Sequence, residues 1–161
     1  MKEIHLTKGK VAIVDDTDFE GLSQWKWHAK LSCGLWYAAR AVTMAGRKIT
    51  IRMHRLITNA SDGMEVDHID GDGLNNLRQN LRIVTRNQNR FNSRVRVDNT
   101  SGYKGVSLNK RTGRWVAWIG YYGKHKNLGY FATPEMAAQA YDAAARELFG
   151  EFARLNFKET T

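Results

Sequence analysis

The sequence predicts an α+β protein: a strand-rich N-terminal region, and then a separate three-stranded antiparallel sheet with one helix. The segments "KVAIVDD", "LWYAARA" and "KITIRMH" are β-rich, and turn formers separate them at residues 32–34 and 45–46. Residues 105–132 hold three strand-like runs with turns near Gly113 and Gly123. A helix then begins at Thr133, because Thr suits the N-cap and Pro134 the first helical position, and it ends at Gly150.

Length and composition exclude several classes of protein. The 161 residues allow one domain or two small ones, and 42% hydrophobic residues can bury a core. No run approaches the roughly 18–20 apolar residues of a membrane span, and the N-terminus lacks the apolar core of a signal peptide. A lone Cys33 excludes a disulfide framework and a cysteine zinc site within one chain. We therefore expect a cytoplasmic protein without a membrane association.

Charge is unevenly distributed along the chain. The net charge is +9, with +5 in residues 1–60, −1 in 61–93, +1 in 94–101 and +4 in 102–161. Basic segments flanking a slightly acidic middle suit a phosphate backbone. The alternative from charge alone is a soluble basic protein without a nucleic-acid partner.

Three regions follow from these patterns. Residues 1–93 form the strand-rich region together with the polar middle of the chain. Residues 94–101 lie in a stretch with no apolar period and several turn formers, which is typical of a linker. Residues 102–157 form a sheet-and-helix unit of about the smallest size that folds alone.

The stretch "EVDHIDGDGLNNLRQNLRIVTRNQN", residues 65–89, gathers carboxylates, a histidine and asparagines in a basic chain. Phosphodiester hydrolysis needs a divalent cation, a base that deprotonates water, and a group that orients the base. Asp67 and His68 are adjacent on a strand, so their side chains point to opposite faces. One can then hold a cation while the other faces water, and Mg²⁺ needs only one or two protein ligands because it retains waters.

The spacing of Asp67-His68, Asn80 twelve positions after His68, and Asn89 nine further resembles the H-N-H nuclease motif. It is most similar to the variant of phage and intron-encoded homing endonucleases, in which Asn is the last motif residue. The resemblance implies a ββα-metal core, two strands and a helix around one Mg²⁺ or Mn²⁺. It makes His68 the general base and Asp67 and Asn89 the metal ligands. Asn80 would hydrogen-bond the imidazole and fix its tautomer.

Some assignments in this region stay open. Asn92 lies about one helical turn from Asn89, so either could be the second ligand. His54, in "RMHRLI", is expected to be a structural histidine, and the alternative is that it touches the site. Arg86 and Arg90 are expected to reach phosphate.

Residues 102–157 resemble a second family, the plant Apetala-two or ethylene-response-factor DNA-binding domain, through "GYKGV", "GRWVA", "AAQAYDAAA" and "LNF". The resemblance implies a sheet that enters the major groove and a helix that braces it from behind. Strand alternation turns Ala117 and Ile119 toward the helix and Trp118 outward, where it contacts DNA or, alternatively, covers apolar surface. The plant domains read bases with arginines that this chain lacks, so base specificity does not carry over. The expected DNA-binding residues of this region are Lys104, Lys110, Arg111, Arg114, Trp118, Lys124 and Lys126.

Together these features predict a metal-dependent endonuclease that hydrolyses double-stranded DNA. One site per chain predicts nicking unless the protein dimerises. The resemblance implies a homing-type enzyme of a phage or mobile element, in the host cytosol, without an obligate protein partner. The first alternative is a DNA-binding regulator with an inactive nuclease core, although none of Asp67, His68 and Asn80 is lost. The second is a basic module that binds RNA or protein; a preference for DNA duplexes over RNA duplexes would exclude it.

Overall fold

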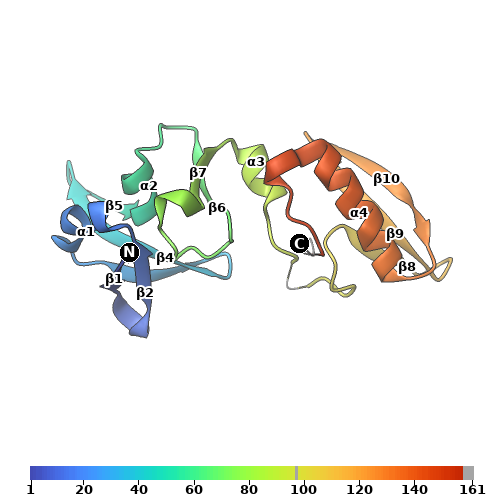
Figure 1. Ribbon diagram of the computed structural model, residues 1–161, viewed down its shortest axis with the longest axis horizontal. Helices are drawn as coiled ribbons and strands as arrows, with labels where there is room; N and C mark the ends of the chain where they lie inside the picture. The colour runs from blue at the N-terminus through green and yellow to red at the C-terminus, as the bar shows by residue number, and fades with distance from the viewer. Residues whose placement is uncertain (97, 158–161) are drawn as a thin grey trace. The chain divides into compact units, whose positions relative to one another are not determined.

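A computed structural model describes residues 1–96 and 98–157, and divides the chain into two compact units, residues 1–86 and residues 87 onward. The first unit runs from blue to green in Figure 1 and the second from yellow to red. Several small antiparallel sheets and a C-terminal helix confirm the predicted mixture of helices and strands. Residue 97 of the expected linker lies outside the described residues.

The first unit contains three antiparallel sheets. β1 (Lys2–His5) pairs with β2 (Val11–Val14), and β6 (Glu65–His68) pairs with β7 (Leu81–Val84). The central sheet has the order β3-β4-β5, formed by β3 (His28–Ser32), β4 (Leu35–Met44) and β5 (Arg47–Arg52). The strand predictions for "KVAIVDD", "LWYAARA" and the first part of "KITIRMH" are confirmed.

Two helices in this unit were not predicted. α1 (Asp16–Ser23) follows β2, and α2 (Met53–Thr58) follows β5 directly, so "MH" of "KITIRMH" is helical. α2 packs against β4 and β5, and this packing buries Met53 and His54. α1 buries only Leu22, and its sequence accordingly shows little of the apolar period that would have predicted a helix.

The core of the first unit joins most of these elements. Ala12 and Val14 of β2, Leu22 of α1, Ala38 of β4 and Met53 of α2 belong to one buried cluster. Burying such side chains supplies the main stabilising free energy of a small unit. The core therefore fixes the sheet and α2 as a frame against which the β6–β7 hairpin is held.

The second unit is a three-stranded sheet with a helix across it (Figure 1). It includes most of α3 (Arg86–Phe91), whose first residue belongs to the first unit, followed by β8 (Val106–Asn109), β9 (Arg114–Tyr121), β10 (Lys124–Phe131) and α4 (Pro134–Phe149). β9 is central. Thr133 caps α4, with its Oγ1 accepting from the amide of Met136 at 3.3 Å, and Gly150 ends it, so both predicted helix ends are confirmed.

A buried carboxylate ties the end of the described chain to this unit. Asp142 of α4 accepts hydrogen bonds from the amides of Asn156 and Phe157 at 2.8 and 2.9 Å. The Asn156 side chain in turn accepts from the amide of Lys104 at 2.6 Å and donates to its carbonyl at 3.2 Å. The "LNF" segment is therefore a structural closure of the sheet-and-helix unit.

Among the described residues, no helix is long and apolar enough to cross a membrane.

Candidate active site

The β6–β7 hairpin carries the acid-histidine pair. Asp67 lies opposite Arg82 and His68 opposite Leu81 in the antiparallel register. Both side chains are buried, with 6% of Asp67 and 5% of His68 exposed. As predicted for neighbours on a strand, they have different partners, and each face of the hairpin can be described separately.

On one face, Asp67 forms an ion pair with Arg82. Arg82 Nε and a terminal nitrogen both contact Asp67 Oδ2, at 2.9 and 2.8 Å. Because the pair is largely buried, removing the arginine would leave a carboxylate charge in a poorly solvated place. A cation that binds Asp67 must therefore compete with, or displace, this arginine.

On the other face, two aromatic rings contact the imidazole of His68. The rings of His54 and His68 are 5.0 Å apart between centroids and nearly perpendicular, and the Tyr37 ring lies 5.9 Å from His68. His54, expected to be a structural histidine with contact to the site as the alternative, lies directly against the ring of His68. Tyr37 was missed altogether, because β4 and β6 are distant in sequence.

The surroundings favour a neutral imidazole at position 68. Burial lowers the pKa of His68 below its ordinary value. The Asn76 side chain and the carboxylates of Asp70 and Asp67 oppose this lowering without cancelling it. Burial and the nearby His68 also lower the pKa of His54, to about 3, so both rings are neutral at pH 7.

Asn80 holds the loop between the two strands. Its Oδ1 accepts from the amide of Asp70 at 3.1 Å, and its Nδ2 donates to Asp70 Oδ1 at 3.0 Å and to the carbonyl of Asn75 at 2.8 Å. Within the described chain, the hydrogen bonds of this side chain all go to the loop. The side chain that interacts with the His68 imidazole is that of the fully buried Asn76, whereas the resemblance implied Asn80 in this place.

The same loop is fastened to the frame at three further points. Ile13 of β2 donates to the carbonyl of Leu74 at 2.9 Å and accepts from the amide of Asn76 at 2.8 Å. Arg78 forms a bidentate pair with Asp18, at 2.8 and 2.6 Å. Gly73 lies so close to the sheet that an added Cβ would be 2.6 Å from the Tyr37 ring. The loop is therefore a rigid support for His68.

The last motif residue lies on α3. Asn89 is half-buried and belongs to the second unit, and Asn92, just beyond the helix, is buried. Among the described residues, no group of three or more His, Cys, Asp or Glu side chains could hold a metal ion. The assignment of Asn89 or Asn92 as the second metal ligand stays a prediction.

α3 is attached to the sheet-and-helix unit through its last residue. The Phe91 ring stacks on Phe149 with centroids 4.0 Å apart, and Lys104 Nζ donates to the Phe91 carbonyl at 2.5 Å. Burial lowers the pKa of Lys104 to about 8. The ammonium group of Lys104 thus caps a helix end, although the sequence suggested that it contacts DNA.

Trp118 is turned outward on β9, as predicted, with 40% of the residue exposed, while Ala117 and Ile119 are buried. Strand register places Asn127 opposite Trp118, and His125 opposite Gly120. Lys126 is opposite Ile119 and Lys124 opposite Tyr121, so both alternate to the other side of the sheet from Trp118. The remaining candidates of the second unit, all exposed, are Arg90, Lys110, Arg111 and Arg114.

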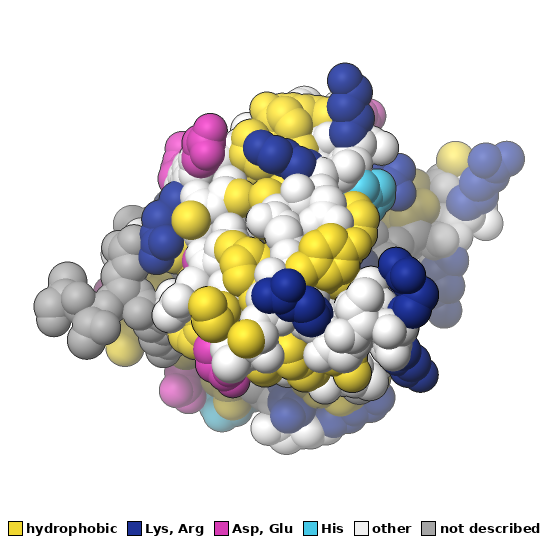
Figure 2. Space-filling model, turned by 90° about the vertical axis from the view of Figure 1, so that its right-hand side faces the viewer, with side chains coloured by type: hydrophobic (Ala, Val, Ile, Leu, Met, Phe, Trp, Pro, Cys, Tyr) yellow, Lys and Arg dark blue, Asp and Glu magenta, His cyan; other side chains and the backbone are white. Residues whose placement is uncertain are grey.

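A hollow of about 430 Å³ in the second unit combines aromatic and basic side chains. Tyr121, Tyr122, Lys124 and Arg90 are among the residues that line it. Figure 2 shows apolar side chains with Lys and Arg side chains distributed around them on one face of the molecule. Aromatic rings beside cations suit a nucleic-acid backbone and its bases.

Arg86, the remaining candidate for phosphate contact, is exposed at the start of α3 and belongs to the first unit.

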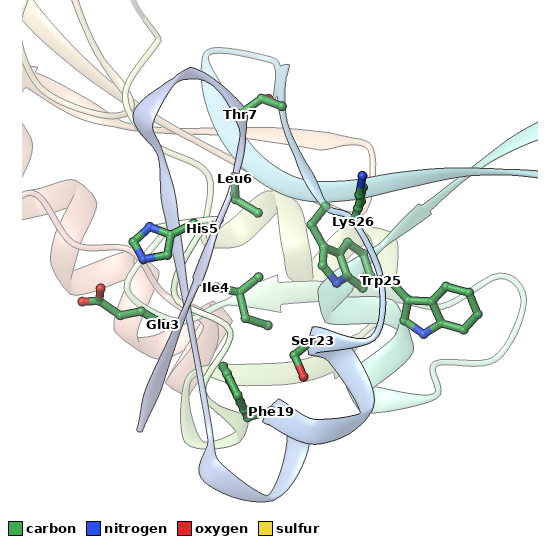
Figure 3. Close-up of a pocket in the computed structure, with 10 residues that line it drawn as sticks. Glu3, Ile4, His5, Leu6, Thr7, Phe19, Ser23, Trp25 and Lys26 are labelled. Atoms are coloured by element: carbon green, nitrogen blue, oxygen red, sulfur yellow. The ribbon is translucent and has the colours of Figure 1, made fainter.

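A second hollow, of about 510 Å³, lies between β1, α1 and the segment that follows α1 (Figure 3). Ile4 and Leu6 point to the side of β1 on which Phe19 and Ser23 lie, whereas Glu3 and His5 point away. None of Asp67, His68, Asn80 and Asn89 lines this hollow. It is an apolar groove beside the core.

Two family models match the chain, in the order that the sequence motifs predict. One described as HNH endonuclease matches residues 53–91, and one described as AP2 domain matches residues 101–151. The first match begins at the start of α2, so it includes His54. No solved structure matches the chain.

Relatives of both kinds are found among known proteins. "Uncharacterized HNH endonuclease L560" of Acanthamoeba polyphaga mimivirus is 34% identical over 145 residues, 86% of this chain and 73% of that protein. "Protein 3.8" of Escherichia phage T7 is 38% identical over 92 residues, 57% of this chain and 75% of that protein. "Ethylene-responsive transcription factor ERF010" of Arabidopsis thaliana is 49% identical over 59 residues, 35% of this chain and 32% of that protein. The chain therefore belongs to the HNH endonuclease family and carries an AP2 domain after its nuclease domain.

Proposed function

We propose that the protein is a metal-dependent endonuclease that hydrolyses phosphodiester bonds in double-stranded DNA. Each chain cuts one strand, in the manner of a homing-type enzyme of a phage or mobile element. The observation that carries this proposal is a buried His68, kept neutral by its surroundings and placed next to Asp67 on a rigid antiparallel hairpin.

His68 is the general base of the proposed reaction. A neutral imidazole can take a proton from water at pH 7, whereas a protonated one cannot. The lowered pKa therefore keeps the base in its active form at neutral pH. Asn76 orients the ring by direct interaction, and Asn80 acts indirectly by holding the loop that carries Asn76.

The donor chemistry of the motif fits a hard cation. The Asp67 carboxylate and the amide oxygen of Asn89 or Asn92 are ligands that Mg²⁺ and Mn²⁺ accept, and such ions keep several waters. When bound, the cation would polarise the phosphate and stabilise the charge that develops during hydrolysis. Arg82, which is paired with Asp67, would have to give way to the cation.

The AP2 domain holds the duplex close to the nuclease site. Its sheet presents Trp118 and Arg114 outward from β9. Contacts from cations to phosphate position a protein without reading sequence, so this surface supplies affinity. Linking it to a weakly bound nuclease raises the effective concentration of the site at DNA.

The test uses purified protein and supercoiled plasmid with Mg²⁺ or Mn²⁺, with and without EDTA, beside Asp67→Ala. The proposal predicts metal-dependent conversion to open circles, abolished by EDTA and by the substitution. Conversion in EDTA would contradict metal dependence. Direct appearance of linear DNA would instead imply a dimer, in which two chains cut both strands.

The inactive-core alternative predicts a different pattern. A regulator would shift plasmid DNA in a gel and leave it intact with both metals, even when the plasmid carries the DNA that flanks the protein's own gene. Cleavage of that plasmid excludes the regulator.

A further inference from the structure

The first unit contains a long stretch without acidic residues. No Asp or Glu occurs between Glu20 and Asp62, and this stretch includes the whole β3–β4–β5 sheet and α2. The same stretch carries seven cations: Lys26, Lys30, Arg40, Arg47, Lys48, Arg52 and Arg55. A surface of one charge sign attracts a polyanion and gains free energy when counterions are released.

Strand register sorts these side chains onto two faces. Opposite residues of antiparallel strands share a face, and Tyr37 is opposite Lys30, Thr43 opposite Lys48, and Ala41 opposite Thr50. We call this side of the sheet the polar face; it includes Lys30, Ser32, Tyr37, Lys48, Thr50 and Arg52. The opposite face carries Arg40 and Arg47 among mostly apolar side chains, which include Trp36, Ala38 and Ile49.

The polar face leads to the catalytic imidazole through a chain of contacts. The Tyr37 ring is 5.9 Å from the His68 ring, and the Arg52 guanidinium lies 4.9 Å from the centre of the Tyr37 ring. Arg52 also donates to Ser32 Oγ at 3.4 Å. Further out, Lys30 Nζ donates to Thr50 Oγ1 at 3.3 Å.

The outer part of the β4–β5 hairpin is exposed on both faces. Thr43, Met44 and every residue from 45 to 50 are exposed, so this part of the ribbon projects from the core. A two-stranded ribbon fits the major groove of B-DNA. Hydroxyl and cationic side chains along one edge are donors suited to phosphate oxygens.

We propose that the polar face of the β3–β4–β5 sheet binds the backbone of the duplex beside the phosphate that is cut. This inference rests on the proposed nuclease function, and adds a DNA-contacting surface separate from the AP2 domain. Lys30 and Lys48 contact phosphates, and Arg52 positions the backbone as it approaches His68. The occupant is double-stranded DNA.

The chain offers a matched control for a charge test. Lys8 Nζ and Lys10 Nζ lie 4.9 and 5.6 Å from the centre of the Trp36 ring, on the mostly apolar side of the sheet. Lys30→Gln/Lys48→Gln and Lys8→Gln/Lys10→Gln therefore remove the same charge from the same unit on opposite faces. Both are made in a His68→Ala background, so that DNA remains uncut during the measurement.

The measurement is the affinity for a fluorescent 30-base-pair duplex at several salt concentrations, by anisotropy. Lys30→Gln/Lys48→Gln is expected to reduce the slope of log K against log salt by about 2, because each lost phosphate contact removes close to 1. The control, Lys8→Gln/Lys10→Gln, is expected to reduce the slope by less than half of that. Equal slopes for the two double variants, or no change in either, would overturn the proposal. So would an equal loss for duplex RNA, which would make the surface a general polyanion site.

A melting curve of each double variant checks that the fold is kept. If either double variant has lost the fold, Lys48→Gln alone and Lys10→Gln alone are compared in the same way, with about half the effect expected. Because the assay measures binding by an uncut complex, its result is independent of whether the wild-type protein cleaves DNA. Failure of this inference and failure of the proposed nuclease function are therefore distinguishable.

Discussion

Replacing Asn80 by Ala tests whether this residue acts through the loop or at the imidazole. The Asn80 side chain is buried and makes three hydrogen bonds, to the amide of Asp70, to Asp70 Oδ1 and to the carbonyl of Asn75, at 3.1, 3.0 and 2.8 Å. A hydrogen bond contributes about 1 kcal/mol net, so the substitution should destabilise the β6–β7 loop by about 3 kcal/mol. Since about 1.4 kcal/mol is tenfold in an equilibrium constant, loop amides should open roughly 100-fold more often.

Hydrogen exchange followed by mass spectrometry, on a peptide that covers residues 65–84, measures this opening. Gln79→Ala is the matched control, because Gln79 is exposed and next to Asn80 in the same 3₁₀ turn. If Asn80→Ala exchanged within about twofold of Gln79→Ala and yet cleaved DNA far more slowly, the loop-holding role would be wrong. Asn80 would then act directly at His68.

Three further predictions concern charge. Arg82→Met should tighten Mn²⁺ binding, measured by calorimetry, because Asp67 loses its competing cation; weaker binding would count against Asp67 as a ligand. The pKa of the buried His54 is lowered to about 3, so as pH drops the unfolded state binds the proton first. The free energy of unfolding should therefore fall below about pH 6.5, by about 2 kcal/mol at pH 5. Urea unfolding of His54→Gln should lose most of that dependence, and an unchanged pH profile would refute it. Lys104→Gln should lower the melting temperature but leave the salt dependence of DNA binding unchanged. Arg114→Gln should lower the slope of log K for DNA binding against log salt by about 1. Equal slopes for the two variants would contradict the capping role of Lys104.

The sheet-and-helix unit was predictable because its signals are local. Thr133 and Gly150 mark the helix ends through their own backbone and side-chain chemistry, and both act as predicted. The alternation of Ala117, Trp118 and Ile119 on β9 also needs no knowledge of distant residues.

The surroundings of His68 were less predictable because they depend on packing between distant segments. Tyr37 of β4, His54 of α2 and Asn76 of the loop reach the imidazole only after the sheet, α2 and the hairpin have assembled. A histidine in "KITIRMH" looks like part of a strand, and only the packing of α2 on the sheet makes it helical and buried.

Side-chain direction on β10 and at Lys104 shows a second limit. Basic residues near Trp118 in the sequence are natural candidates for DNA contact. Strand register places Lys124 and Lys126 on the side of the sheet opposite Trp118. Lys104 Nζ donates a hydrogen bond to the carbonyl of Phe91. Composition therefore identifies a basic unit but does not decide which cations face a ligand.

The most direct test of the account compares cleavage by the wild type, His68→Ala and His5→Ala under the metal conditions in which the wild type cuts. His5 is an exposed histidine on β1 and serves as the matched control. The account predicts that His68→Ala binds the same DNA with unchanged affinity but loses cleavage by at least 100-fold, a typical contribution of a general base, while His5→Ala cuts normally. Cleavage by His68→Ala at a rate near that of the wild type would contradict the assignment of His68 as the base, and with it the central claim.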